Sequence, residues 1–193
     1  MPRLDWQIAL KAFGGFLAGL ALWLLLSPLY NGLVARGAEA VLRTFERPAV
    51  THLRTVETDD SIVVDRSDFD PRSKRPVLAI EDLTFNVILL CALFAIGPAT
   101  FSDRNIRGFL LAMVLLIPTH ILGAVTEVMS LYVLKLGPWS RVHYSDLERN
   151  VWSVANHFYR LVLMYAIAFG LWWLCRPQAA AAPARAARKK RRK

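Results

Sequence analysis

The sequence predicts an all-α membrane protein: a four-transmembrane-helix bundle with a small α+β segment outside the membrane, between the first and second helices. Two observations lead to this fold class. Hydrophobic residues make up 55% of the 193 residues and gather in four long runs, while the charged residues, 20% of the chain, lie between these runs and at the C-terminus. Helical runs of about 20 apolar residues can cross the hydrocarbon layer. The composition excludes a disordered chain and a disulfide-rich secreted module, and it argues against a soluble nucleic-acid-binding protein.

The four predicted spans cover residues 12–29, 83–101, 109–134 and 151–175. No small-residue cleavage motif follows the first run, so we expect an uncleaved helix rather than a signal peptide. The spans and the segments between them form a single integral membrane domain, residues 1–176. A basic cytoplasmic tail, residues 177–193, follows it and is expected to be disordered.

The orientation follows from the short basic flanks. Arg3 and Lys11 precede the first span, Arg104 and Arg107 separate the second and third spans, and the tail supplies much of the net charge of +9. By the positive-inside rule these flanks face the cytoplasm. We therefore expect a multi-pass protein of a bacterial inner membrane with both termini cytoplasmic. The tail would lie against anionic lipid, with partner or nucleic-acid binding as the weaker alternative.

The outward segment, residues 31–82, is predicted to contain a helix and a small sheet. Apolar residues recur at helical spacing over residues 33–45, which favours an amphipathic helix near the outer leaflet. Short β-rich runs at residues 50–56, 61–64 and 76–80 indicate two or three strands. The alternative is a poorly ordered loop. The second outward loop, residues 137–150, has no basic excess.

Ionisable residues inside the predicted spans define the candidate site. Such residues cost about 2.5 to 3.5 kcal/mol at a helix centre unless they are paired. Glu127 and Arg160 lie at similar depth in antiparallel spans, so we expect them to pair. With neighbouring polar residues they form a candidate intramembrane cluster that faces outward: Asn86, Glu127, Asn156, His157 and Arg160. The alternative is that these groups only hold the helices together.

Other polar residues carry weaker signals. His120 lies two turns deeper than Glu127, beside Pro118, where a kink is expected. The sequence has no zinc-binding His-Glu-x-x-His motif, and Ser130 lacks the glycines of a serine hydrolase, so we expect no metal site and no cofactor. Cys91 and Cys175 lie inside apolar runs and are expected to pack as small hydrophobic residues.

Several short motifs nevertheless resemble one known family. They are the strand-like Val77–Ile80 that runs into a helix, Ile96–Phe101 before a basic turn, Val128–Tyr132 late in the third span, and Asn156–Tyr159 early in the fourth. Together they resemble the exosortase and archaeosortase family. These membrane transpeptidase-like enzymes process C-terminal sorting signals at the outer face of the cytoplasmic membrane.

The resemblance implies a catalytic Cys at the outer start of one span, an Arg late in the next and a His early in the last. His157 matches the His. Residues 80–86 contain no Cys, and Glu127 stands where the Arg is expected. Without a thiolate no acyl-enzyme of that kind can form. The chain is thus most similar to a catalytically degenerate relative, of the type described as exosortase H-associated membrane proteins.

The leading functional hypothesis is a non-catalytic accessory protein of an exosortase-type protein-sorting system. Its partners would be the lipid bilayer and either the sorting enzyme or the C-terminal membrane helix of a sorted protein. One alternative is an active transpeptidase-like or protease-like enzyme with replaced catalytic residues, using Glu127 or the pair Glu81 and Asp82. A small transporter subunit is a further alternative, but the absence of an inverted repeat argues against it.

Overall fold

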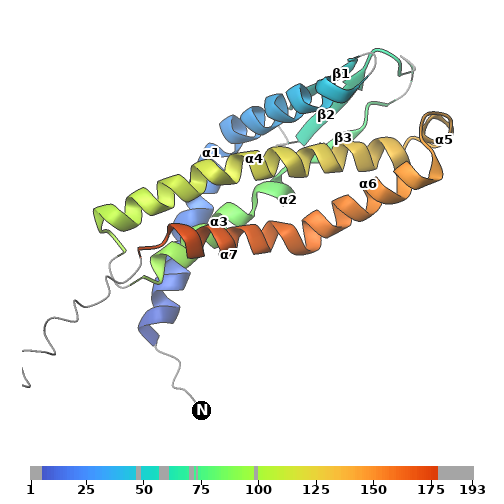
Figure 1. Ribbon diagram of the computed structural model, residues 1–193. Coiled ribbons are helices and arrows are strands. Elements are labelled where there is room, and N and C mark those ends of the chain that lie inside the picture. The colour runs from blue at the N-terminus through green and yellow to red at the C-terminus, as the bar shows by residue number, and fades with distance from the viewer. Residues whose placement is uncertain are drawn as a thin grey trace, which may run out of the picture.

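The computed structural model describes residues 6–46, 49–56, 61–69, 72, 74–97 and 100–177. Helices dominate this part of the chain, and a small sheet stands beside one end of the long helices (Figure 1). The elements are, in order, α1 (Trp6–Phe45), β1 (Thr51–Thr55), β2 (Ser61–Arg66), β3 (Val77–Ala79), α2 (Glu81–Thr84), α3 (Asn86–Ala95), α4 (Asp103–Leu134), α5 (Pro138–His143), α6 (Asp146–Phe158), the π-helical η1 (Tyr159–Leu163) and α7 (Met164–Cys175). Apart from Pro177, the predicted tail lies outside the described residues.

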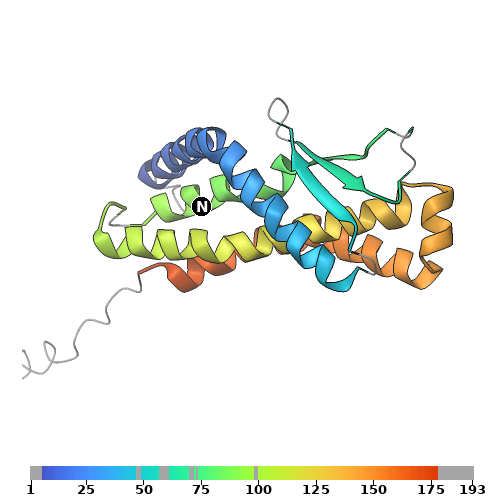
Figure 2. The ribbon, with the colours of Figure 1, turned by 90° about the horizontal axis from the view of Figure 1, so that it is seen from above.

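α1 unites two segments that the sequence analysis separates. The predicted first span, residues 12–29, and the predicted amphipathic helix, residues 33–45, form one helix of 40 residues that changes direction along its length (Figure 2). Pro28 explains a bend, because proline removes one hydrogen bond and its ring crowds the preceding turn. The second half packs against the sheet and α4, and it buries Val34, Ala35, Ala38 and Leu42.

The first half of α1 packs against α3 at very short range. A Cβ atom at Gly15 would lie 2.4 Å from the Cβ of Ala95, and one at Gly19 would lie 2.7 Å from the Cβ of Cys91. Small residues allow such close contact between helices within membranes. These two glycines of α1 therefore allow it to pack closely against α3.

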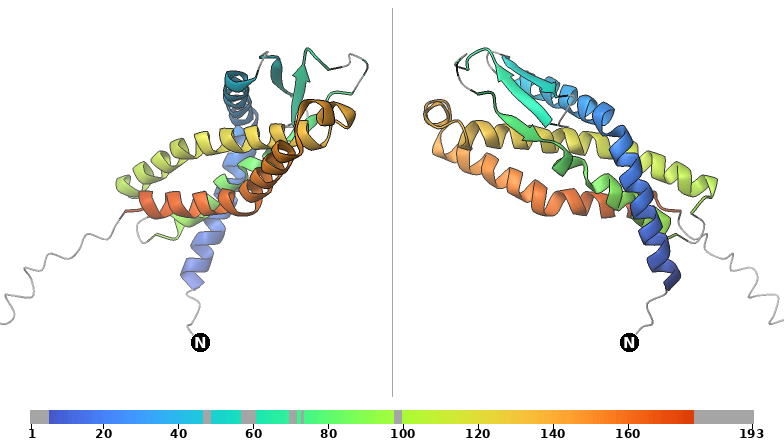
Figure 3. Two further views of the ribbon diagram at one scale, coloured as in Figure 1. Left: turned by 45° about the vertical axis from the view of Figure 1, so that its right-hand side comes forward. Right: turned by 180° about the vertical axis from the view of Figure 1, so that it is seen from behind.

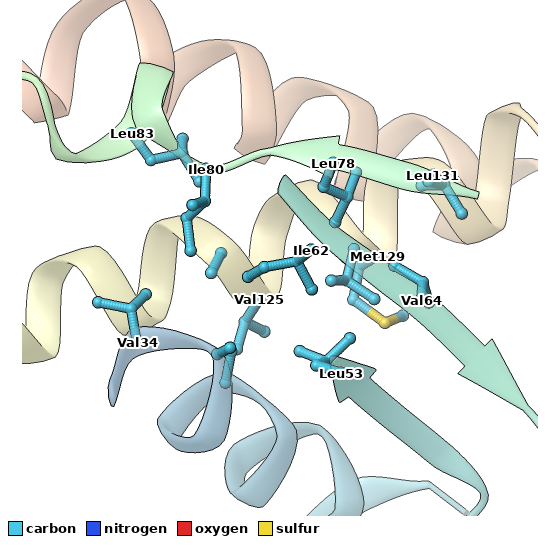
Figure 4. Packing of buried hydrophobic residues seen from close by; sticks show 14 of the residues in the cluster. Val34, Leu53, Ile62, Val64, Leu78, Ile80, Leu83, Val125, Met129 and Leu131 are labelled. Atoms are coloured by element: carbon cyan, nitrogen blue, oxygen red, sulfur yellow. The ribbon is translucent and has the colours of Figure 1, made fainter. Parts of the chain in front are cut away.

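The predicted small sheet is confirmed, with three antiparallel strands in the order β1-β2-β3. Thr51 pairs with Arg66, and Ile62 pairs with Leu78. One face of the sheet packs against α1 and α4, as Figure 4 shows. The buried apolar residues labelled there are Val34, Leu53, Ile62, Val64, Leu78, Ile80, Leu83, Val125, Met129 and Leu131.

The predicted four-helix bundle is not confirmed. Three helical stretches of the described chain are long and apolar enough to span a membrane: Trp6–Phe45, Asp103–Leu134 and Asp146–Cys175. The predicted second span, residues 83–101, is instead occupied mainly by α3, which has ten residues. α2 precedes it, and Phe85 between them keeps helical backbone angles.

α4 and the stretch from α6 to α7 run side by side away from the sheet, as Figure 3 shows from two further directions. The buried apolar residues of the described chain form two separate cores. The sheet-end core includes the residues of Figure 4. The terminal-end core is built on Val87, Leu90, Phe94, Ala112 and Leu116, with Cys91 and Cys175 packed against it. At this terminal end the Lys11 ammonium lies 3.4 Å from the carbonyl oxygen of Gly97. The beginning of α1 and the ends of α3 and α7 therefore meet at the end opposite the sheet.

Candidate functional site: an ion-paired cluster below the sheet

Three charged side chains meet directly below the sheet. The Arg160 guanidinium donates to Asp82 Oδ2 at 2.9 Å, and its other terminal nitrogen lies 3.5 Å from Glu127 Oε2. The side chain of Glu127 is 10% exposed, whereas those of Arg160 and Asp82 are 41% and 57% exposed. The expected pairing of Glu127 with Arg160 is present. Asp82 is a second partner for Arg160 that the sequence analysis did not assign.

Each member of this cluster comes from a different element. Asp82 lies in the first turn of α2, directly after β3, and Glu127 lies on the face of α4 that packs toward the sheet-end core. Arg160 lies in η1. In a regular α-helix, residues three or four positions apart lie on the same face. Here the successive buried residues, Tyr159 and Met164, are five positions apart. The π-helical turn thus sets which side chains of the last helical stretch face inward, and such turns are frequent at functional sites.

A chain of buried hydrogen bonds lies behind the charged cluster. The Asn86 amide nitrogen donates to the carbonyl oxygen of Met164 at 3.0 Å, so Asn86 Oδ1 accepts from His120 Nε2 at 2.5 Å. His120 Nδ1 then accepts from the Tyr30 hydroxyl at 2.6 Å. The partners fix the His120 tautomer with its proton on Nε2. One histidine thus links α1, α3, α4 and α7.

Tyr159 reinforces the contact between α4 and η1. Its hydroxyl donates to the carbonyl oxygen of Thr119 at 2.8 Å. A Cβ atom at Gly123 would lie 2.4 Å from the Tyr159 ring, so the ring occupies the space that a larger residue would fill. The absence of a side chain at Gly123 therefore allows η1 to pack closely against α4.

The structure separates the other predicted members of the cluster. Asn86 belongs to the His120 chain, and Asn156 is buried with its Oδ1 unpartnered within the described structure. His157 is exposed on the outer face of α6, and its Nδ1 lies 2.8 Å from the Ser153 carbonyl oxygen one turn earlier. The expected single cluster with His157 is therefore not formed. His157 follows the buried Asn156 by one position, so it points away from the protein.

Two sequence signals could have found the missing members. Asp82 is the second residue after the predicted strand at residues 76–80. His120 lies two turns before Glu127 on the same helix, and it is fully buried. A buried histidine requires hydrogen-bond partners, which points to polar residues such as Asn86 on a neighbouring helix.

A second charged cluster ties the sheet to the helices. Arg66, the last residue of β2, is buried and bonds to Glu46 at 2.7 Å and to Asp68 at 2.9 Å. Its guanidinium also lies over the rings of Tyr132 and Trp139, at 4.9 and 5.2 Å from their centres. Every charge here has a partner within the protein, which indicates a structural role.

Electrostatic coupling within this second cluster is strong. The hydrogen bond from Arg66 lowers the pKa of the Asp68 carboxyl below its usual value. Burial by itself would lower the pKa of Arg66, but the bond to Asp68 and the neighbouring Tyr132 and Glu46 outweigh it and raise the pKa above its usual range. The pair therefore stays ionised at neutral pH.

An apolar groove of about 780 Å³ opens at the terminal end, between α1, α3 and the start of α4. Gly14 and Ala18 form part of its wall on α1, and Phe94 and Phe109 form part of the opposite wall. A Cβ atom at Gly14 would meet no other atom within 4 Å, so the wall is open there. Lys11, near the start of α1, also lines the groove.

The chemistry available to the charged cluster is limited. Within the described part of the chain, no three His, Cys, Asp or Glu residues are grouped to hold a metal ion. Both cysteines of the chain pack against the terminal-end core, away from Asp82 and Arg160. The cluster offers two carboxylates, both bound by one guanidinium. This arrangement suits recognition of a polar group or the fixing of helices relative to one another.

Comparison with known proteins identifies the family of this chain. The family model for the exosortase H-associated membrane protein matches residues 4–163. Among curated proteins and solved structures, none matches the chain. The family match covers α1, the sheet, α4, α6 and η1, and therefore includes all three residues of the charged cluster. The chain belongs to the exosortase H-associated membrane protein family.

Proposed function

We propose that this protein is a non-catalytic accessory component of an exosortase-type protein-sorting system, and that it binds the sorting enzyme or the C-terminal membrane tail of its substrate. One observation carries the proposal. Residues 80–86, where the resemblance implies a catalytic Cys, contain Asp82, and Glu127 stands where the resemblance implies an Arg. Arg160 forms ion pairs with both of these carboxylates, and His157, which matches the expected His, lies on the exposed face of α6. A guanidinium is no nucleophile, and here its ion pairs occupy both carboxylates.

The sorting reaction takes place at the outer face of the membrane, and we place the sheet end of this protein on that face. Phe69, just after β2, contacts Trp139 of α5, with ring centres 5.5 Å apart. These two residues must lie on the same side of the membrane. Because α4 crosses once between them, a second crossing is needed, and residues 81–97 are the segment available for it.

The dimensions support this four-pass arrangement. Residues 81–97 and residues 159–175 each contain roughly 17 residues, or about 25 Å of helix at 1.5 Å per residue. Both stretches begin at the charged cluster and end at the terminal end. This length is slightly less than the roughly 30 Å hydrocarbon layer, and a modest thinning of the bilayer can accommodate the difference. Both termini would then face the cytoplasm, as the positive-inside rule predicts.

The apolar groove between α1, α3 and α4 supports a binding role for the membrane domain. It lies at the level of the proposed spans, and Gly14 and Ala18 lie in its wall. Small residues allow a second helix to approach closely in a membrane. The groove therefore offers a place for an apolar segment of a sorting partner.

The test compares sorting with and without the charges of the cluster. In the native host, the triple variant Asp82→Asn, Glu127→Gln and Arg160→Met removes all three charges at nearly constant volume. If the role is accessory, we expect this variant, at wild-type abundance, to retain most of the sorting of a tagged substrate, whereas deletion of the protein impairs sorting. Loss of sorting in the triple variant alone would instead favour an enzyme that uses carboxylates.

A binding measurement completes the test. The tagged protein, purified in mild detergent, should co-purify with the exosortase or with a substrate that carries its membrane tail. A substrate without its C-terminal membrane helix serves as the control. If neither the enzyme nor the tailed substrate co-purifies under conditions that preserve the fold, the accessory proposal fails.

A further inference from the structure

α6 turns its most apolar face away from the rest of the protein. The helix begins with a capping box between Ser145 and Glu148, and its inner face carries the buried Asn156. Its outer face, continued into η1, carries side chains that are 51% to 74% exposed: Leu147, Val151, Val154, Phe158 and Leu161. Where such apolar surface lies outside the hydrocarbon layer, it marks an interaction site.

The spacing of these residues indicates the kind of partner. Within α6 they follow one another at intervals of four, three and four residues, and Leu161 follows three residues later in the π-helical η1. Alternation of four and three residues is the spacing of two helices that pack as a coiled coil. In heptad terms Val151 and Phe158 occupy the a positions of α6, and Leu147 and Val154 occupy the d positions. Val151 and Leu147 match the preference of two-stranded assemblies for a β-branched residue at a and leucine at d.

The surface of the stripe has the shape that this packing requires. A shallow hollow of about 430 Å³ is lined by Ser153, Val154, His157, Phe158, Leu161 and Val162. Four of these, at positions 154, 157, 158 and 161, are related as i, i+3, i+4 and i+7. Four residues in this relation form the hole that receives one side chain of a facing helix. Phe158 projects beside this hollow on the same face.

From these observations we propose that two copies of this chain associate through parallel packing of their α6 helices, with Phe158 of each copy inserted into the hollow of the other. The face carries both a hole and a matching side chain, so it is self-complementary, as a two-fold interface must be. Copies inserted in one membrane share one orientation, which makes the two α6 helices parallel. This inference rests on the membrane arrangement given under the proposed function but not on the accessory role itself, since it concerns only copies of this chain.

Lipid is the competing cover for the stripe, and the sequence of α6 argues against it. Asp146, Glu148 and Arg149 lie in the first turns of the helix. In the arrangement proposed above, the hydrocarbon layer begins near Arg160, so most of the stripe lies outside it. A partner helix, not an acyl chain, then covers these residues.

Cysteine cross-linking in native membranes tests the interface. In the full-length protein, Cys91 and Cys175 are first changed to Ala, and single cysteines are introduced as Leu147→Cys, Val151→Cys or Val154→Cys. Mild oxidation should give a covalent dimer at twice the 21.8 kDa mass of the chain, because a and d positions face their equivalents within the reach of a disulfide. Leu110→Cys is the matched control, an exposed apolar position on α4, and it should give little or no dimer.

A second substitution removes the proposed inserted side chain. Phe158→Ala should greatly reduce cross-linking through Val151→Cys, whereas Val114→Ala, at an exposed apolar position on α4, should leave it unchanged. Equal cross-linking at Leu110→Cys would show random collision and overturn the proposal. An absence of dimer at all three stripe positions would point to lipid cover and overturn it too. An adduct of another mass would identify a different protein as the occupant and refute self-association.

Discussion

Arg160 forms ion pairs with two carboxylates, so replacing this one side chain affects two other charged groups. Glu127 is nearly buried, while Asp82 is more than half exposed. The exposed pair with Asp82 contributes little, because water screens it. The cost of losing Arg160 falls mainly on Glu127, which would keep an unpaired charge in a poorly solvated place.

We therefore predict that Arg160→Met destabilises the folded protein by roughly 1 to 3 kcal/mol. Adding Glu127→Gln to this variant should restore part of the loss, because the stranded charge is then gone. Thermal unfolding in detergent measures both effects, and Arg141→Met, at an exposed arginine of α5, serves as the control. Strictly additive losses in the double variant would contradict the coupling.

The pair of Arg66 and Asp68 should make stability depend on pH. The pKa of Asp68 lies below its ordinary value of 3.8 because Arg66 donates a hydrogen bond to the carboxylate. A carboxyl group with a lowered pKa in the folded state favours folding above the ordinary pKa, and this contribution disappears as pH falls through the lowered value. The stabilisation is thus present at neutral pH and lost in acid.

For Asp68→Asn we predict lower thermal stability than the wild type at pH 7, and a difference that shrinks as pH falls below about 4. Unfolding temperatures of both proteins across this range, in one detergent, measure the effect. A difference that stays constant from pH 7 to pH 3 would mean that the carboxylate charge of Asp68 contributes nothing.

At the level of elements, the sequence predicts the sheet, α4 and the last helical stretch well, because their periodic patterns are strong. The sequence does not predict which residues of the last helical stretch face the interior. A regular α-helix would bury residues three and four apart, but Tyr159 and Met164 are five apart because η1 inserts one extra residue. No hydrophobic pattern predicts such an insertion. The wrong orientation assigned to His157 reflects the same limit, since the sequence places it on the face of Arg160.

The contact between η1 and α4 is sensitive to small changes in volume. We predict that Gly123→Ala destabilises the protein by about 1 to 3 kcal/mol, because its Cβ would displace the Tyr159 ring and break the hydrogen bond to Thr119. Gly170→Ala is the matched control, since its Cβ would meet nothing within 4 Å. The control should be neutral or slightly stabilising because alanine favours helix. Equal effects of the two changes on thermal unfolding would refute this account of the packing.

For the whole molecule, the number of membrane crossings is the feature that length and hydropathy alone do not settle. α3 is too short to count as a span by itself, and the contact between Phe69 and Trp139 favours the proposed return of the chain between them. The sequence analysis expects four spans from hydrophobic length, whereas three helical stretches of the described chain are long and apolar enough to span a membrane, so the fourth crossing is part of our proposal. The depth of the charged cluster could not be predicted, because it depends on where the sheet docks against α4.

The four-pass arrangement makes a prediction that a three-pass arrangement does not share. With four crossings, a reporter phosphatase fused after Lys193 stays in the cytoplasm and is inactive, while one inserted near Asp70 is exported and active. With three crossings the C-terminal fusion would be active, because the two termini would lie on opposite sides. A cytoplasmic reporter at the same positions should show the reverse pattern, and protein abundance must be equal for the comparison to hold. Phosphatase activity after Lys193 together with activity near Asp70 would exclude the fourth crossing and, with it, the proposed position of the charged cluster at the outer edge of the hydrocarbon layer.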